Sequence, residues 1–181
     1  MTQFGKFMEV FFIQLAAYSG YTQISDYSKL TAFAETNSVC KTRKSQVDYA
    51  RQNKGLAPLK WTGQDYLDHV YKIDVALVYS GQLFGYQITT IQSSEAVFSQ
   101  KLTKVKQSWQ LCEKAGFTWT TLVGINADYN VCSTMFNNLE HSIKERLADE
   151  FFDAMLLFID QFDPEEGSPL TTCKPIFLNL R

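Results

Sequence analysis

The segment Tyr71–Ile91 constrains the fold most, because it has the pattern of two β-strands joined by a tight turn. Residues 71–79 read YKIDVALVY, in which polar and apolar positions alternate and several side chains are β-branched. Ser80 and Gly81 offer a two-residue turn before a second run at Leu83–Ile91. The pattern predicts an antiparallel β-hairpin with Ser80 and Gly81 as its loop.

A two-residue loop also fixes which residues of the hairpin face each other. Asp74 then sits opposite Gln87, and because side chains alternate along a strand, the hairpin has one polar and one apolar face. The small side chains of Ala76 and Gly85 leave room above the polar face, either for a ligand or metal or for a packing helix. The expected polar face carries Lys72, Asp74, Ala76, Gly85, Gln87 and Thr89, and the expected apolar face carries Ile73, Val75, Leu77, Phe84, Tyr86 and Ile88.

Helical patterns lie on both sides of the hairpin. Apolar residues recur at helical spacing from Phe4 to Leu15 and again from Phe98 to Cys112, and a glycine follows each run. Further along the chain we expect a buried strand at 118–125, helices from about 131 to 147 and on to 159, and either a strand or an extended arm at 175–180.

The stretch from 21 to 62 has weaker periodicity. Residues 30–34 and 46–52 suit short helices, Gly55 and Pro58 mark a loop, and a short edge strand also fits here. A chain of 181 residues is long enough for one substantial core. We therefore expect a single α/β domain over residues 1–181, with an insert of undetermined structure at about 21–62.

Charge and hydropathy limit which binding partners and which cell compartment we expect. A net charge of -2 argues against strong, sequence-independent binding to nucleic acid, so any contact with nucleic acid must be local. No apolar stretch approaches the roughly 20 residues of a membrane span, and the N-terminus has no secretory signal. We expect a soluble, cytoplasmic protein with no membrane partner. Two basic clusters are either local nucleic-acid contacts or solvated faces: Lys41, Arg43 and Lys44, and Lys101, Lys104 and Lys106.

The four cysteines are Cys40, Cys112, Cys132 and Cys173, and they lie far apart in the sequence. The chain has only two histidines. This spacing favours buried free thiols over a structural zinc site.

The hairpin resembles the core of a known family. An Asp on one strand, a short hairpin, then acidic-x-Lys on the next strand, followed by a helix and a strand, is the hallmark of the PD-(D/E)XK nuclease superfamily. The matching segments are IDVALV at Ile73–Val78 and GYQIT at Gly85–Thr89. Family members often contribute a helical Glu, and Glu9 stands in the corresponding place. The resemblance implies a restriction endonuclease-like core of helix, mixed sheet with hairpin, helix and strand, with additional C-terminal helices.

The chemistry of that family needs carboxylates to hold a divalent ion, usually Mg²⁺, and a Lys to orient or deprotonate the attacking water. The resemblance therefore implies a metal site formed by Glu9, Asp74 and Gln87, with Mg²⁺ as cofactor and Lys72 as a further catalytic residue. Gln87 offers a carbonyl oxygen without charge, which forfeits about 4 kcal/mol of Coulomb attraction at an effective dielectric of about 20. A weak metal site is expected.

Thr89 occupies the Lys position of the motif and supplies no positive charge. Loss of such a stabilising group costs ~10² to 10³ in rate. The residues that could replace the lysine are Lys72 on the neighbouring strand and Lys101 or Lys104 on the following helix. Glu95, at the start of that helix, could replace the missing acid.

The same residues also have purely structural interpretations. Asp74 could be a strand-edge charge paired with Lys72, Gln87 a cross-strand hydrogen-bonding residue, and Glu9 a solvated helix position. His69, which precedes the strand, is either a general base or metal ligand or a loop histidine with no special role.

Aromatic residues such as Trp61 and Trp119 fit core packing better than base stacking.

Two functions follow as hypotheses. The first is a PD-(D/E)XK-like protein acting on DNA, either as a Mg²⁺-dependent endonuclease with a modified site or as a silent descendant that binds nucleic acid. The second is a catalytically inactive module of the same fold that binds protein through its aromatic-rich helices. A homodimer is compatible with both.

Overall fold

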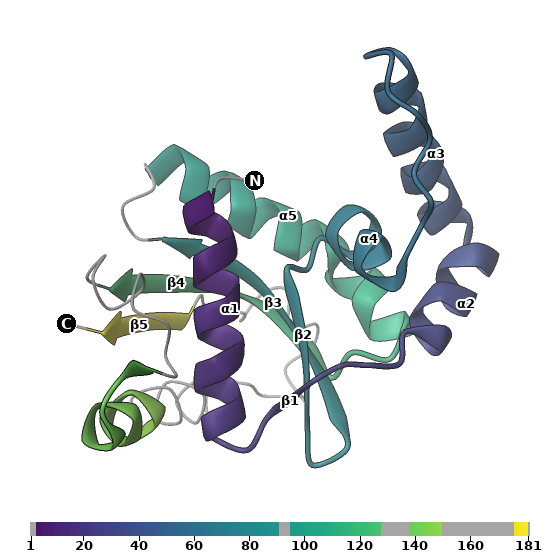
Figure 1. Ribbon diagram of the computed structural model, residues 1–181. Coiled ribbons are helices and arrows are strands. Elements are labelled where there is room, and N and C mark those ends of the chain that lie inside the picture. The colour runs from purple at the N-terminus through teal and green to yellow at the C-terminus, as the bar shows by residue number, and fades with distance from the viewer. Residues whose placement is uncertain (1–2, 91–94, 128–137, 150–175, 181) are drawn as a thin grey trace.

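A five-stranded mixed sheet forms the centre of the protein (Figure 1), in a computed structural model that describes residues 3–90, 95–127, 138–149 and 176–180. The strand order follows the chain order, β1-β2-β3-β4-β5. The first two pairings are antiparallel and the last two are parallel. The α/β prediction is therefore confirmed. The strands are β1 (Thr22–Gln23), β2 (Val75–Tyr79), β3 (Gln82–Thr90), β4 (Trp119–Ala127) and β5 (Ile176–Leu180).

The predicted hairpin is confirmed in its loop and its register. Val75 pairs with Tyr86, and Tyr79 pairs with Gln82, so Ser80 and Gly81 form the two-residue loop between β2 and β3. Both loop residues have positive φ, 49° and 77°. Two successive residues of this conformation match the right-handed twist of the strands, which explains why glycine is favoured in this turn.

The chain before β2 does not extend the strand back to Tyr71, as the sequence pattern predicted. The helix α4 (Gly63–Tyr66) runs directly into a π-helix, η1 (Leu67–Tyr71), and Lys72 ends it in the left-handed conformation with φ of 61°. The amide of Ile73 still donates to the Leu67 carbonyl at 3.0 Å. The strand alternation therefore does not reach Lys72 or Ile73, and their assignment to strand faces was wrong.

The room predicted above Gly85 is filled by protein. A Cβ atom on Gly85 would lie 2.5 Å from Cδ1 of Ile73 and 2.8 Å from Cγ2 of Thr120. Ile73 packs in the same apolar cluster as Ala76 instead of on the Val75 side of β2. The small residues on this face accommodate neighbouring side chains of the protein itself.

The helix α1 (Gln3–Tyr18) crosses one face of the sheet (Figure 1). Its apolar stripe packs on the face predicted to be apolar, where the rings of Phe12 and Tyr86 lie 5.0 Å apart. Gly20, with φ of 89°, follows the helix end as predicted. The buried cluster between α1 and the sheet includes Met8, Phe11, Phe12, Leu15, Val75, Leu77, Tyr86 and Ile88.

The helix α5 (Glu95–Lys114) links β3 to the parallel strand β4. Its residues Leu111 and Cys112 pack with Ala76 in a second cluster, which also contains the buried Tyr71. Gly116, with φ of 103°, follows the end of this helix, as the sequence pattern predicts. The π-helix and α5 are thus held together by one apolar cluster.

The insert contains more helix than its sequence pattern suggested. The helices α2 (Ser28–Thr36) and α3 (Ser38–Gln52) are separated only by Asn37, whose side chain accepts hydrogen bonds from the amides of Val39 and Cys40. The edge strand β1 pairs with β2, which confirms the short strand considered for this region. Figure 1 shows α3 extending away from the sheet.

The C-terminal third confirms the final strand, since β5 runs parallel to β4. Residues 141–149 are helical, and Leu147 and Ala148 join the cluster beneath α1. The helices predicted at 131–137 and 150–159 lie outside the described residues, as do Cys132 and Cys173.

Cys40 and Cys112 are buried free thiols, as expected. In the described ranges no helix has both the length and the apolar character needed to cross a membrane.

Candidate functional site

Asp74 and Gln87 lie side by side at the start of the hairpin, in the arrangement that the two-residue loop predicted. The side-chain amide of Gln87 donates to Oδ2 of Asp74, and the backbone amide of Ile88 donates to the same oxygen at 2.8 Å. The backbone amide of Asp74 in turn donates to the Tyr86 carbonyl at 2.9 Å. The carboxylate is therefore fixed against β3 by one side chain and one main-chain donor.

Lys101, on α5, bonds to Ile88, the β3 residue whose amide donates to Asp74. Its Nζ donates to the backbone carbonyl of Ile88 at 2.7 Å, and its positive charge lowers the pKa of both Asp74 and Glu9. Among the lysines considered for the missing motif position, Lys101 is thus the one that the structure places beside Asp74. Lys72 instead lines a pocket between α3, the π-helix and α5, because the left-handed turn takes it out of the strand.

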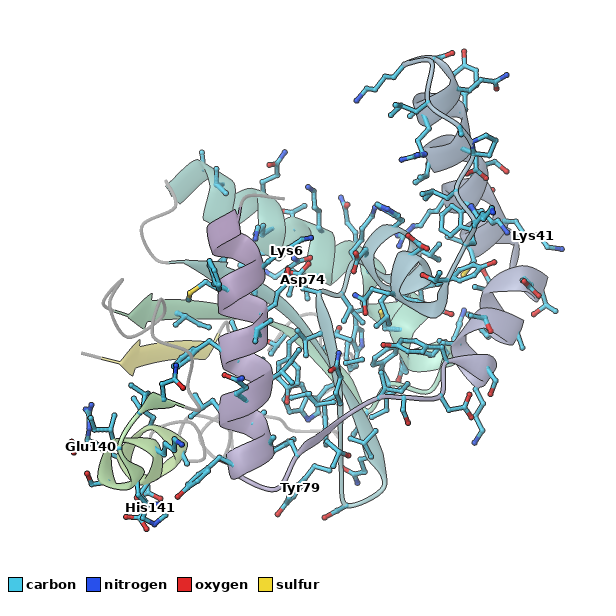
Figure 2. All side chains as sticks on the ribbon, viewed as in Figure 1. Lys6, Lys41, Asp74, Tyr79, Glu140 and His141 are labelled. Atoms are coloured by element: carbon cyan, nitrogen blue, oxygen red, sulfur yellow. The ribbon has the colours of Figure 1, made fainter. Side chains whose placement is uncertain are left out.

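Glu9 approaches the same site from α1. Burial, together with the negative charges of Asp74 and Asp68, raises the pKa of Glu9 from 4.5 to about 7, while the positive charges of Lys101 and Lys6 act in the opposite direction. Figure 2 shows Lys6 and Asp74 next to the same half of α1. Glu9 therefore belongs to one electrostatic neighbourhood with Asp74.

Asp68 is a member of the site that the sequence did not reveal. It lies in the π-helix, where its Oδ1 accepts from Nε2 of Gln64 at 2.7 Å, and the same Nε2 lies 3.2 Å from the backbone carbonyl of Asp74. Burial raises the pKa of Asp68, and the carboxylate of Asp68 raises the pKa values of Glu9 and Asp74. Gln64 therefore links the π-helix to the start of the hairpin.

A sequence signal for this element did exist. Thr62 and Asp65 form a capping box, in which the Thr62 hydroxyl accepts from the Asp65 amide and the Asp65 carboxylate accepts from the Thr62 amide at 2.8 Å. A Thr followed three residues later by an acidic residue is a known helix start signal. It would have placed Asp68 on a helix, though not beside Asp74.

The oxygen donors at this site are of the kind that Mg²⁺ and Mn²⁺ prefer, namely carboxylates and carbonyls. Asp74 and Asp68 both raise the pKa of Glu9, and Asp68 also raises that of Asp74, so a bound cation would relieve this accumulation of negative charge. Within the described ranges, no three His, Cys, Asp or Glu side chains are grouped closely enough to hold a metal ion. Gln87 directs its NH₂ group to Asp74, so its amide would have to rotate before its oxygen could join a ligand set there.

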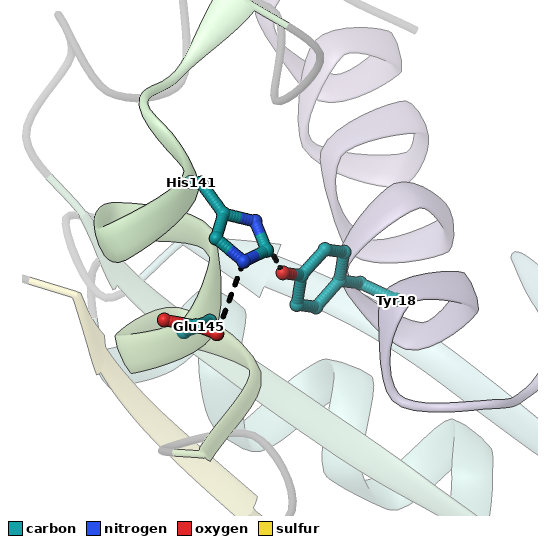
Figure 3. Close-up of polar contacts among 3 residues, drawn as sticks. All are labelled: Tyr18, His141 and Glu145. Atoms are coloured by element: carbon teal, nitrogen blue, oxygen red, sulfur yellow. Dashed lines mark hydrogen bonds and ion pairs between the residues drawn. The ribbon is translucent and has the colours of Figure 1, made fainter.

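A second polar cluster joins α1 to the helical residues 141–149 (Figure 3). The Tyr18 hydroxyl lies 2.9 Å from Nδ1 of His141, whose Nε2 lies 3.1 Å from Glu145. Desolvation and the charges of Glu145 and Asp149 raise the pKa of Tyr18, which makes the phenol a weaker acid than usual. Because the His141 and Glu145 side chains are 75% and 58% exposed, we interpret this cluster as a docking contact between the two helices.

The remaining residues singled out in the sequence have mainly structural positions. His69 lies in the π-helix and not in a loop, with its ring 6.0 Å from that of Trp61. Trp61 is half-buried, and its indole N–H donates to Asp48. Trp119 is buried in the core, as expected. Glu95 begins α5, and its side chain lies outside the described part of the structure.

Comparisons with known proteins give no relative for this chain. No family model matches the sequence, and neither the curated proteins nor the solved structures contain a significant match.

Proposed function

We propose that the protein is a PD-(D/E)XK-like protein that acts on DNA, and that it hydrolyses phosphodiester bonds with a divalent metal ion. The observation that carries the proposal is the position of Lys101, whose ammonium group comes from the helix after the hairpin and bonds to the Ile88 carbonyl, next to the Asp74–Gln87 pair. The order of helix, hairpin, crossover helix and parallel strand is also the order expected for a restriction endonuclease-like core.

In this proposal Glu9 and Asp74 would hold Mg²⁺, and Gln87 would add its amide oxygen after rotation. When bound, the metal would polarise the phosphate and lower the pKa of a water molecule. Lys101 would orient that water and offset the negative charge that develops on the phosphate oxygens. It would supply the charge that Thr89, a buried strand residue, lacks.

The second candidate is a catalytically inactive protein of the same fold, and the hydrogen bonds at Asp74 favour it. One carboxylate oxygen already accepts from both Gln87 and the Ile88 amide, which satisfies the charge without a cation. Such a protein would bind nucleic acid or another protein without cleaving a substrate.

A cleavage assay separates these candidates. The wild-type protein is incubated with Mg²⁺ or Mn²⁺ and with linear, nicked, branched and single-stranded DNA, beside Asp74→Asn and the control Glu113→Gln, an exposed position of α5. We expect metal-dependent cleavage by the wild type and the control and none by Asp74→Asn. Cleavage by all three proteins would identify a contaminant, and no cleavage by any of them would remove the enzymatic proposal.

If no cleavage occurs, the salt dependence of DNA binding decides between the silent forms. A nucleic-acid binder loses affinity steeply as salt rises. Its binding releases cations from the phosphates, and a higher salt concentration makes that release less favourable. A module that binds only protein shows no measurable DNA affinity even at low salt.

A further inference from the structure

A basic pocket lies between α3, the end of the π-helix and α5, separate from the Asp74 site. Its volume is about 300 Å³, and its lining combines cationic and polar side chains from all three elements with the apolar Val47 and Ala50 of α3. The two basic clusters of the sequence, one on α3 and one on α5, each contribute one residue here. The lining residues that can donate a hydrogen bond or carry positive charge include Arg43, His69, Lys72, Lys104 and Ser108.

Arg43 forms the fixed wall of this pocket. Its Nη1 donates to the Val70 carbonyl at 2.5 Å and to Oγ of Ser108 at 3.0 Å, and its Nη2 donates to the Gln107 carbonyl at 3.5 Å. These acceptors are neutral, so they orient the guanidinium without cancelling its charge. Arg43 thereby joins α3 to the π-helix and to α5.

Lys72 is held at the pocket by an unusual backbone conformation. It adopts φ of 61° at the end of the π-helix, a region that residues other than glycine rarely occupy. It lines the pocket together with Arg43 and Lys104, so this backbone conformation places three cationic side chains around one space.

The positive charge of the pocket is not balanced by a neighbouring ion pair. Among the described residues, no carboxylate forms an ion pair with Arg43, Lys72 or Lys104. This concentration of cations occurs in a chain whose net charge is -2. A charge arrangement of this kind is stabilised by an anion with several oxygens, which can accept from a guanidinium and from ammonium groups together.

We propose that this pocket binds a phosphate group. The group belongs either to free phosphate or to the backbone of a nucleic acid, and the donors that recognise it are Arg43, Lys72 and Lys104. The Ser108 hydroxyl and the His69 ring line the same space. The proposal does not require the metal site or a cleavage reaction, so it goes beyond the function proposed above.

Titration with inorganic phosphate at low ionic strength tests the proposal. Lys104→Gln is the principal variant, because Lys104 is exposed and its loss should leave the fold intact. Lys106→Gln is the matched control, an exposed lysine two positions away on the same helix that does not line the pocket. We expect saturable phosphate binding that Lys104→Gln weakens about tenfold and that Lys106→Gln leaves unchanged.

Two results would overturn the proposal: no saturable binding by the wild type, or equal weakening by both variants. Lys72→Met provides a second variant at the pocket, with circular dichroism as the check on its folding. Asp74→Asn should bind phosphate as the wild type does, so failure of the cleavage proposal leaves this one standing.

A competing oligonucleotide identifies the source of the phosphate. If a short DNA strand displaces inorganic phosphate, and Lys104→Gln weakens the DNA as well, the pocket binds a backbone phosphate. If DNA does not compete, the ligand is free phosphate or a small phosphorylated molecule. Both results support a phosphate pocket.

Discussion

The ammonium nitrogen of Lys101 lies 2.7 Å from the carbonyl oxygen of Ile88, whose own amide nitrogen donates to Asp74 at 2.8 Å. One peptide segment of β3 therefore connects a lysine from α5 to a carboxylate at the base of the hairpin. This link supplies a positive charge near the position where the motif of the sequence has Thr89. It also makes the role of Lys101 open to direct measurement.

Replacing Lys101 with Met should lower metal-dependent cleavage by ~10² to 10³, the usual cost of removing one group that stabilises developing charge. Lys106→Met is the control, because Lys106 is an exposed lysine of the same helix. Lys101 lowers the pKa of Glu9, so the Met variant should also titrate Glu9 at a higher pH, measured by NMR. An unchanged Glu9 titration would show that Lys101 does not act on the carboxylates.

Glu9 should make the folded protein less stable as the pH rises. Its pKa is raised from 4.5 to about 7, first by burial and then by Asp74 and Asp68, so the folded state binds a proton that the unfolded state has lost. The stabilising contribution is complete below about pH 4.5 and is lost as the pH passes 7.

The variant Glu9→Gln tests this effect by urea unfolding at pH 5 and pH 8. Because Glu9 is only half-buried, solvent screening reduces the expected gain to about 1 kcal/mol at pH 8 relative to pH 5. A gain of the same size at both pH values would indicate that the titration of Glu9 does not affect folding.

Binding of Mn²⁺ should strengthen with pH through the same titration. A carboxylate must lose its proton before it can coordinate a metal, so the apparent affinity should rise about tenfold per pH unit below pH 7 and level off above it. Calorimetric titration from pH 6 to 8 measures this dependence. In Glu9→Gln the affinity should be weaker and nearly independent of pH, and a pH dependence like that of the wild type would assign the proton to another group.

The hairpin was predictable from the sequence because its turn leaves little freedom. Two residues with positive φ, one of them Gly81, fix the pairing and place Asp74 opposite Gln87. The prediction that Lys72 lies in a strand was wrong for two reasons. The spacing of apolar residues does not distinguish a one-turn π-helix from the start of a strand, and a lysine with positive φ has no sequence signature. Tyr71 is buried, and its hydroxyl donates to the Leu30 carbonyl at 2.7 Å. These tertiary interactions favour the π-helix over a strand.

Other parts of the site depend on tertiary structure that local patterns do not encode. The helix α3 is mostly polar and buries only Cys40, so it lacks the apolar stripe by which α1 was recognised. Lys101 could be proposed from its position on α5, but its choice over Lys104 depends on how that helix is rotated. Asp68 joins the site only because the π-helix folds back on the hairpin.

Gly85→Ala should destabilise the sheet beside the site. The new Cβ would meet Cδ1 of Ile73 at 2.5 Å and Cγ2 of Thr120 at 2.8 Å, and overpacking of this kind costs about 1 to 3 kcal/mol. Adding Ile73→Val removes the nearer methyl group and should restore part of the loss. Urea unfolding of the single and double variants measures both effects, and additive losses would contradict the predicted contact.

Cys112 should resist alkylation in the folded protein. It is fully buried, its thiol lies 3.6 Å from the Tyr71 carbonyl, and burial raises its pKa to about 12. Because the thiolate is the reactive form, iodoacetamide at pH 8 should modify Cys112 only after denaturation. Site-resolved mass spectrometry of native and urea-treated protein measures the difference, with the buried Cys40 as a second reporter of the same cluster. Rapid modification of native Cys112 would show that the cluster joining the π-helix to α5 opens readily, and the Asp68 side of the site could not then be rigid.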